Sequence, residues 1–255
     1  MQKKEKTFFQ QLQEIFNQIV ERNHLKKVQV QVKAWPLKPE EAIGCPKRKD
    51  YVLLKGKERL VQAEVMGHRG QAFTSSLGDY NGTLEEVMNL PLDNDFHRAV
   101  YIATFNAVAS YTGSTGKTLH CRNEGPEKCS MKVADFFRQT YGNPKILMLG
   151  YQPTLAEPLV REFEVKVLDL DPANIGKTIN EVQILDGSGN TEPYIKNADV
   201  IFATGSILCN QTIEHYYNTG RPLVLYGTTG AGAAALLNLP RFCPESSEGN
   251  AGHPA

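Results

Sequence analysis

Apolar residues in the first part of the chain recur at helical spacing and then alternate with polar ones. From Phe8 to Val20 they follow one side of a helix, which predicts an amphipathic first helix. From Val28 to Ala34 every second residue is apolar, the pattern of a half-exposed strand. Short apolar runs predict further strands at 51–54, 60–65 and 71–75, with a hairpin turn at 55–58. Together these segments predict a small α+β unit with an antiparallel sheet.

Helical patterns follow the predicted strands. Thr83 is placed to cap a helix over 84–89, and Asp95 is placed to cap the next one. The second helix has an apolar face wide enough to indicate that it is largely enclosed. Asn106 interrupts this face, so it is either a core amide with local partners or a residue that contacts a ligand.

A loop rich in Gly, Ser and Thr over 111–126 precedes the last helix of this part. Ser130 is a candidate cap for a helix over 131–141. Gly142, Asn143 and Pro144 form a cluster of helix breakers, which we take as the domain boundary.

The stretch 143–171 has the pattern of a βαβ unit. Residues 144–150 are a short apolar run that ends in Gly, as in a strand buried on both faces, and a short helical pattern follows. A second apolar run ends at Asp169, with Asp171 just beyond it. Ligands of such sheets lie at the carboxyl ends of the strands, so Gly150 and Asp169 are expected to flank a site.

The rest of the chain continues the same alternation. Strands are predicted at 182–185, 198–203 and 222–226, with a turn at 186–190 and a helix at 211–217. Beyond Phe242 the residues lose apolar periodicity, which predicts a disordered tail. The expected organisation is an α+β domain at 1–142, a Rossmann-like parallel-sheet domain at 143–243 and a tail at 244–255.

Charge and composition exclude several classes of function. Lys plus Arg and Asp plus Glu are both 28, so the formal net charge is zero and no nucleic-acid surface is expected. No apolar run approaches the roughly 20 residues of a membrane span. The N-terminal segment lacks the apolar core of a signal peptide. Five Cys without a disulfide-framework spacing favour reduced thiols and a cytoplasmic protein.

Nucleotide motifs are incomplete. Gly116-Lys117-Thr118 and Gly176-Lys177-Thr178 lack the upstream Gly of a phosphate-binding loop. The turn after Gly150 lacks the second and third Gly of a dinucleotide site, and it is less Gly-rich than that of most methyltransferases.

Two later loops are better candidates for a binding site. The segment 203–212 follows a predicted buried strand and carries Thr204, Ser206, Asn210 and Thr212. The segment 227–232 holds the same position after the last strand. Hydroxyl groups and free amides at neighbouring strand ends can cradle an anion or a polar ring. The alternative is that these residues only form ordinary α/β loops.

Metal chemistry has one candidate set of ligands. His120, Cys121 and Cys129 lie in or beside one loop, and imidazole and thiolate suit zinc or a thiophilic ion. The spacing is wider than that of compact structural zinc sites, so inert free thiols are the alternative. Cys209 is either a site thiol or a packed one.

Several motifs together resemble a known family. The Gly-Tyr-x-Pro turn at Gly150, the Thr-Gly-Ser-x-x-x-Asn-x-Thr pattern from Thr204 and the Tyr-Gly-Thr-Thr loop from Tyr226 resemble the DUF364 family, labelled as linked to heavy-metal chelation. The helix with Phe105-Asn106-Ala107 resembles the same family's DUF4213 N-terminal part. The resemblance implies an enolase N-terminal-like domain packed on a Rossmann-like domain, with a site where the two meet.

From these patterns we expect a two-domain α/β protein that binds a polar small molecule or a metal chelate, with a divalent or thiophilic metal ion as its candidate cofactor. The family resemblance implies the making or handling of a pterin-, flavin- or siderophore-like chelator by condensation or hydrolysis. A metal-binding or metal-delivery protein and a methyltransferase-like enzyme are the alternatives, and the sequence is compatible with a homo-oligomer. The expected ligand-binding residues are Gly150, Tyr151, Asp169, Asp171, Thr204, Gly205, Ser206, Asn210, Thr212, Gly227, Thr228, Thr229 and Asn106.

Overall fold

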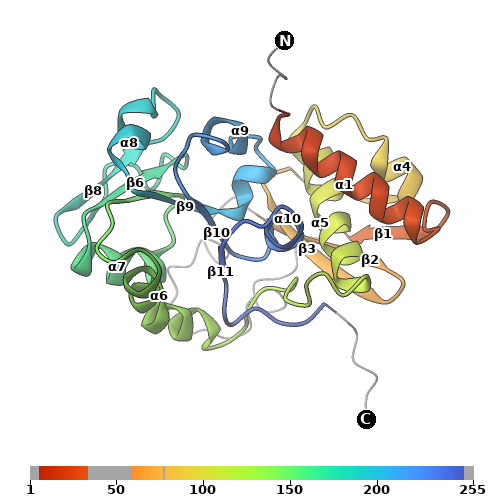
Figure 1. Cartoon of the computed structure of the whole chain (residues 1–255), viewed down its shortest axis with the longest axis horizontal. Coiled ribbons are helices and arrows are strands. Elements are labelled where there is room, and N and C mark those ends of the chain that lie inside the picture. Colours follow the sequence, from red (N-terminus) through yellow and green to blue (C-terminus); the bar gives the residue numbers. More distant parts are fainter. Residues whose placement is uncertain (1–5, 34–58, 77, 250–255) are drawn as a thin grey trace.

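A computed structural model describes residues 6–33, 59–76 and 78–249 of the chain. Its described strands form two sheets, a four-stranded antiparallel one and a mostly parallel one (Figure 1). This confirms the predicted fold class of an α+β unit followed by a parallel-sheet unit. The strand expected at 51–54 and the hairpin turn expected at 55–58 lie outside the described residues.

The antiparallel sheet has the order β3-β2-β1-β4. Its strands are β1 (Gln29–Lys33), β2 (Arg59–Val65), β3 (His68–Thr74) and β4 (Tyr80–Thr83). In β1, Val30 and Val32 are buried while their neighbours are exposed, as the alternation predicts. The β2–β3 register turns at Met66 and Gly67, both of which have positive φ.

Three helices accompany this sheet: α1 (Phe8–Arg22), α4 (Leu84–Met88) and α5 (Asp95–Tyr111). Thr83 caps α4 and forms a capping box with Glu86, as predicted for its position. The cap of α5 is Asn94, whose side chain accepts the His97 N–H, and not Asp95 as predicted. Asp95 is instead the first helical residue and pairs with Arg98 at 2.5 Å.

Helix α5 is the central element of the N-terminal unit. Its residues from Arg98 to Ser110 are all buried, as its wide apolar face predicts. The helix lies directly on β3, because a Cβ at Gly70 would be only 2.3 Å from the Ala107 amide nitrogen. Glycine at that position permits the close approach of helix and strand.

The helix predicted at 131–141 begins earlier in the structure than the sequence pattern indicates. Helix α6 runs from Gly125 to Tyr141, with Pro126 in its first turn, where the missing N–H costs nothing. Ser130 therefore lies inside the helix and does not cap it. By packing, α6 belongs with the parallel sheet, since Val133 and Phe137 are part of the core on one face of that sheet. A boundary at 142/143 would separate α6 from the sheet that it covers.

The parallel sheet has the order β11-β10-β9-β5-β6-β8-β7, with β7 antiparallel to β8. The strands are β5 (Ile146–Leu149), β6 (Val165–Asp169), β7 (Thr178–Ile179), β8 (Val182–Asp186), β9 (Val200–Thr204), β10 (Leu223–Tyr226) and β11 (Arg241–Phe242). Every residue of β5 is buried, as expected for a strand covered on both faces. The predicted βαβ unit is present as β5, α7 (Pro153–Glu162) and β6.

Successive side chains of the central strands enter different cores. Ile146 and Met148 of β5 pack with α6 and α7 on one face. Leu147 and Leu149 face the core on the opposite side. The elements contributing to that second core from this half include α8 (Glu192–Asn197), the short 3₁₀ helix η1 (Gly205–Leu208), α9 (Ile213–Tyr216) and α10 (Ala231–Leu236). Helix α9 is shorter than the predicted 211–217, because Gln211 has a positive φ of 65°.

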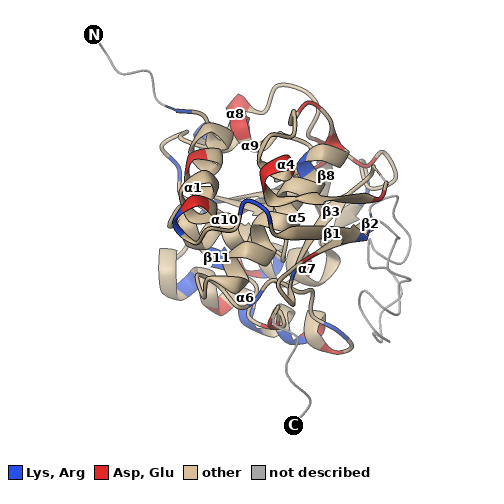
Figure 2. Cartoon of the chain, turned by 90° about the vertical axis from the view of Figure 1, so that its right-hand side faces the viewer, with Lys and Arg blue, Asp and Glu red and all other residues tan. Residues whose placement is uncertain are grey.

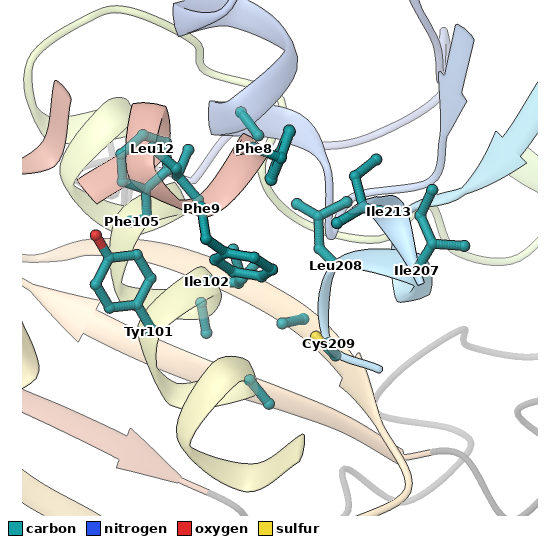
Figure 3. Close-up of a cluster of buried hydrophobic side chains, with 14 of the residues drawn as sticks. Phe8, Phe9, Leu12, Tyr101, Ile102, Phe105, Ile207, Leu208, Cys209 and Ile213 are labelled. Carbon is teal, nitrogen blue, oxygen red and sulfur yellow. The ribbon is translucent and has the colours of Figure 1, made fainter. Parts of the chain in front are cut away.

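One hydrophobic core joins the two halves. Phe8 and Leu12 of α1 and Phe105 of α5 belong to the same buried cluster as Leu208 and Ile213 (Figure 3). The carboxylate of Glu214 accepts the backbone N–H groups of Phe8 and Phe9, so it caps α1 from the other half of the chain. The antiparallel sheet is thus attached to the parallel sheet by packing as well as by covalent connection.

The end of the chain is more structured than its sequence predicts. A disordered tail was expected from residue 244, but the described part of it, to Gly249, packs against earlier segments. Ser247 pairs with Leu119 in an isolated bridge, and Gly249 accepts the Arg69 N–H and donates its own N–H to the Gly116 carbonyl. Backbone pairing, which needs no apolar periodicity, explains why the pattern did not reveal this segment.

Charges are mixed over the surface. Figure 2 shows short basic and short acidic stretches scattered over both halves of the molecule, in keeping with the zero net charge. Within the described residues, no helix combines the length and the apolar character that crossing a membrane requires.

Candidate functional site

A cavity of about 480 Å³ lies at the carboxyl ends of the central parallel strands. Its position follows from the topology. The chain leaves β5 toward α7 on one face and leaves the neighbouring β9 toward η1 and α9 on the other, so a crevice forms between the two strand ends. The antiparallel half contributes Phe73, Thr74 and Ser75 to the cavity wall. The cavity therefore lies where the two halves meet.

Most of the expected ligand-binding residues line this cavity. Those that do are Gly150, Tyr151, Asp169, Asp171, Thr204, Gly205, Ser206, Asn210, Thr212, Gly227 and Thr229. Asn106 and Thr228 are not among the lining residues. The loops at 203–212 and 227–232 thus lie at one edge of the sheet.

Gly150 sets the spacing between the ends of β5 and β9. Its φ is +83°, and a Cβ there would lie 2.6 Å from the Thr204 methyl carbon and 3.1 Å from the Tyr226 hydroxyl oxygen. The Tyr226 hydroxyl donates to the Gly150 carbonyl at 2.6 Å. Only glycine satisfies both the dihedral angle and the close approach.

Asp169 organises the opposite side of the cavity. One of its carboxylate oxygens accepts the Tyr151 N–H and the other accepts the Asp171 N–H. Asp171 in turn accepts the Ala173 N–H at 2.9 Å. These acids form local turns with the backbone, so Asp169 holds the two strand ends together, while the less buried Asp171 lies at the wall.

The loop after β9 is also fixed by its own side chains. The Thr204 and Ser206 hydroxyl oxygens are 3.0 Å apart, and Asn210 accepts both the N–H and the hydroxyl of Thr212. The buried guanidinium of Arg98 in α5 donates to the Cys209 carbonyl at 2.6 Å. An arginine from the antiparallel half therefore positions a loop of the parallel half.

Asn106 is a core amide and does not face the cavity. Its side chain is fully buried, donates to the carbonyls of Gln71, Thr228 and Thr229, and accepts the Gly232 N–H at 2.7 Å. These partners correct the expectation that Asn106 contacts a ligand, because backbone groups already satisfy its amide. Thr228 is likewise fully buried, beneath the loop and not at its surface.

The described cavity wall carries acids but no basic side chain of Lys or Arg. Asp95, Asp169 and Asp171 line it, together with His120. Burial lowers the pKa of His120, although its contact with the Cys121 carbonyl acts the other way, so the neutral imidazole is favoured. Such a wall disfavours a phosphate group and suits a neutral or cationic ligand.

Thiols form another part of the wall. Cys121, Cys129 and Cys243 all line the cavity, and interaction between the first two raises the pKa of Cys121 and lowers that of Cys129. The His120 Nδ1 atom is 2.6 Å from the Cys121 carbonyl oxygen, and its ring meets Phe73 edge-on. Within the described chain, no three His, Cys, Asp or Glu side chains are grouped as metal ligands. The structure thus brings the two predicted thiols together but not the expected three-ligand set.

Sequence reasoning missed several wall residues. Phe73 of β3 and Ser75 just after it reach the cavity wall from the antiparallel sheet. The sequence has no pattern that indicates a contact between segments so far apart in the chain. The sequence does not indicate that Cys243 approaches the other thiols, yet the end of the chain returns to Cys121. Cys209 lines the cavity but also belongs to the shared core shown in Figure 3.

A comparison with known families matches the second half of the chain. Residues 132–239 match the DUF364 family. Its description reads "Putative heavy-metal chelation". The DUF364 match begins inside α6 and ends before β11, so it covers all strands of the parallel sheet but β11, and most of the cavity wall. The DUF4213 and enolase N-terminal-like assignment of the preceding residues stays a prediction.

A solved structure of a DUF364 protein shares this architecture. That protein, of unknown function and from Pyrococcus horikoshii, is 17% identical, with a TM-score of 0.51, and the alignment covers 86% of this chain and 79% of that one. Another DUF364 protein of unknown function, from Desulfitobacterium hafniense, is 13% identical with a TM-score of 0.46 over 70% and 72% of the two chains. At this identity the likeness to the first shows the fold alone. No curated protein matches the chain.

Proposed function

We propose that this protein binds a neutral or cationic small molecule of the chelator type in the cavity between its two sheets. The observation that carries the proposal is the wall itself, which has three aspartates, a histidine and thiols but no Lys or Arg among the described residues. A volume of about 480 Å³ lies in the range of small-molecule sites. The DUF364 description supports a ligand connected with heavy metals.

The proposal concerns binding, in the sense of a carrier or of an enzyme's substrate site. Phe73, Leu149 and Ile207 give the cavity wall apolar surface, and Thr204 and Ser206 give it hydroxyl groups, a combination that suits a pterin-like or flavin-like ring. Condensation or hydrolysis stays a prediction from the family resemblance. Cytoplasmic location and homo-oligomer formation also stay predictions from the sequence.

Asp171→Asn tests the charge of the cavity. The amide keeps an oxygen that can accept the Ala173 N–H, so the turn should persist while one negative charge is lost. For a cationic ligand we expect about threefold weaker binding, the size of one partly screened charge contact. Native mass spectrometry of freshly purified protein measures the fraction that carries the co-purified compound.

Asp186→Asn is the matched control for that experiment. Asp186 ends the adjacent strand β8 and accepts the Ser188 N–H at 2.8 Å, the same turn geometry, but it does not line the cavity. Its variant should retain wild-type occupancy. A co-purified compound bearing phosphate groups, or equal loss in both variants, would contradict the proposed ligand class.

Metal bound in this cavity would have mixed ligands. Cys121 and Cys129 supply two adjacent soft donors, which suit a thiophilic ion, and a chelating molecule in the cavity would supply the remaining ligands. Thiols lose their protons on coordination, so metal content should fall as the pH drops.

Elemental analysis of anaerobically purified protein tests this thiol contribution. Replacing both residues, as Cys121→Ser with Cys129→Ser, should lower the metal content after challenge with a thiophilic ion. Cys45→Ser serves as the single-site control and should retain it. Equal metal in the wild type and the double variant would remove the thiols from the metal site and leave the small molecule as the chelator.

A further inference from the structure

One part of the cavity wall combines an exposed leucine with polar groups. Five wall residues follow the ends of the neighbouring strands β6 and β8, and we call their surface the β6–β8 corner: Leu170, Asp171, Pro172, Asn174 and Gly187. Leu170 is 46% exposed, which is unusual for a large apolar side chain in this protein. A flat ring in the cavity can cover this side chain and remove its apolar surface from water.

The polar groups of the β6–β8 corner can accept and donate hydrogen bonds. Asp171 is half-buried, and one of its carboxylate oxygens accepts the Ala173 N–H at 2.9 Å. Since a carboxylate can accept about four hydrogen bonds, Asp171 can also accept from hydroxyl groups of a ligand. The side-chain oxygen of Asn174 accepts from the Lys177 ammonium group at 3.1 Å, so its NH₂ group is the donor that a ligand could use.

The first turn of α7 does not offer a site for phosphate. In Rossmann-like sheets the N–H groups at the start of the helix after the first strand bind phosphate. Here Pro153 is the first residue of α7 and has no N–H. The side-chain oxygen of Gln152 accepts the Leu155 N–H at 3.1 Å and the Thr154 hydroxyl at 2.7 Å. The protein's own side chain thus occupies donors that a phosphate group would need.

We propose that the β6–β8 corner binds a ribonucleoside without phosphate groups, or the nucleoside part of a larger phosphate-free molecule. The base covers Leu170, and the two ribose hydroxyls donate to Asp171. An acid about 20 residues beyond the first Gly turn is the usual partner of ribose hydroxyls in Rossmann-like sheets, and Asp171 meets this spacing from Gly150. The inference rests on the proposed function, because it names a ligand class for the same cavity.

Equilibrium dialysis of extensively dialysed protein against adenosine, guanosine, cytidine and uridine tests the inference. At least one of them should bind. Its 2′,3′-dideoxy analogue should bind about tenfold more weakly, because it lacks the hydroxyls that donate to a charged carboxylate. Its 5′-monophosphate should also bind about tenfold more weakly, because the phosphate meets acids and no basic side chain in the described wall.

Asp171→Ala should bind the ribonucleoside and its dideoxy analogue equally, since the carboxylate that distinguishes them is gone. Asp186→Ala is the control and should keep the tenfold preference. Asp186 ends β8 and accepts the Ser188 N–H, as Asp171 accepts an N–H two residues on, but it is not a wall residue. The comparison of the two nucleosides in the wild type needs no variant, so it remains decisive if Asp171→Ala does not fold.

Leu170→Ser should weaken binding of both nucleosides about fivefold, because apolar contact with the base is lost. Met131→Ser is the control for this change and should bind as the wild type does. Met131 is 71% exposed and is not a wall residue, so its replacement removes a similar apolar side chain from outside the cavity.

Three results would each overturn the inference. They are a dissociation constant above about 1 mM for all four ribonucleosides, equal binding of the 5′-monophosphate, and a ribonucleoside preference that persists in Asp171→Ala. If no ribonucleoside binds but the compound carried through purification is neutral or cationic and phosphate-free, only the nucleoside assignment fails. A co-purified compound with phosphate groups would contradict the proposed function as well, so the two failures are distinguishable.

Discussion

At the scale of single residues, Asn106 shows how a polar side chain can connect two sheets. Its amide bonds to β3, to the loop after β10 and to α10, and all its partners are backbone groups. Asn106→Ala should cost about 3 kcal/mol, roughly 6–12 °C in Tm for a chain of this size, because buried backbone groups lose their partners. Thermal unfolding followed by circular dichroism measures the change.

Asn89→Ala is the control for Asn106→Ala. Asn89 is exposed and donates to one carbonyl at the end of α4, so its loss should change Tm little. Weaker ligand binding by Asn106→Ala without a fall in Tm would show that Asn106 belongs to the binding site.

Cys129 should reveal its ionisation in the rate of alkylation. Hydrogen bonds from Cys121 and the Glu245 N–H lower its pKa, and the Lys132 charge contributes, whereas burial and the Glu245 carboxylate oppose them. A lowered pKa keeps the thiolate at pH values where ordinary thiols are protonated. The pH midpoint for iodoacetamide labelling of Cys129 in Cys121→Ser should therefore lie below that of a model thiol, since serine still donates a hydrogen bond. Lys132→Gln should raise this midpoint. An unchanged midpoint would show that the Lys132 charge does not contribute to the lowered pKa of Cys129.

At the scale of elements, the ends of β5 and β9 depend on Gly150. Gly150→Ala would place a methyl group 2.6 Å from the Thr204 methyl carbon at a φ of +83°. We expect destabilisation by about 3 kcal/mol, the sum of the dihedral cost and overpacking. Adding Thr204→Ser removes the clashing methyl group and should recover part of the lost free energy of unfolding, as measured by urea denaturation.

Gly176→Ala isolates the cost of the dihedral angle. Gly176 has a φ of +85° with nothing within 4 Å of a built Cβ, so its variant should lose only about 1–2 kcal/mol. If the Gly150 and Gly176 variants were equally destabilised, close packing at the cavity would not be the reason for Gly150.

Local patterns predict elements better than their boundaries. The alternation in β1 and the buried run of β5 gave the correct strands, because burial there follows directly from periodicity. The start of α6 was predicted six residues late, at Met131 in place of Gly125. The signal missed was Pro126, which is favourable in a first helical turn, whereas Ser130 resembles a cap but lies within the helix.

At the scale of the whole molecule, the position of the site at the strand ends could be predicted and its wall could not. The edge of a parallel sheet follows from chain order, so Gly150 and Thr204 were placed together from the sequence. The approach of Phe73 and Cys243 depends on how two sheets and the end of the chain pack. Asn106 was placed wrongly because its partners are backbone atoms of distant segments, which the sequence does not identify.

The shared core predicts how the protein unfolds. Because Phe8, Phe105, Leu208 and Ile213 belong to one cluster, neither sheet can open without exposing apolar surface of the other. We expect a single transition in which calorimetric and van't Hoff enthalpies agree. Two separated transitions would show that the halves are independently stable.

The Glu214 carboxylate that caps α1 has a consequence for exchanging halves between relatives. A chimera that joins residues 6–111 of this protein to the parallel sheet of a distant relative would lack the matched acceptor for the Phe8 and Phe9 N–H groups. It would also present a foreign surface to the rings of α1 and α5. Recombination after residue 111 should therefore yield insoluble hybrids unless α1 and the η1–α9 segment are transplanted together. The two sheets are thus expected to be exchangeable between relatives only as one piece.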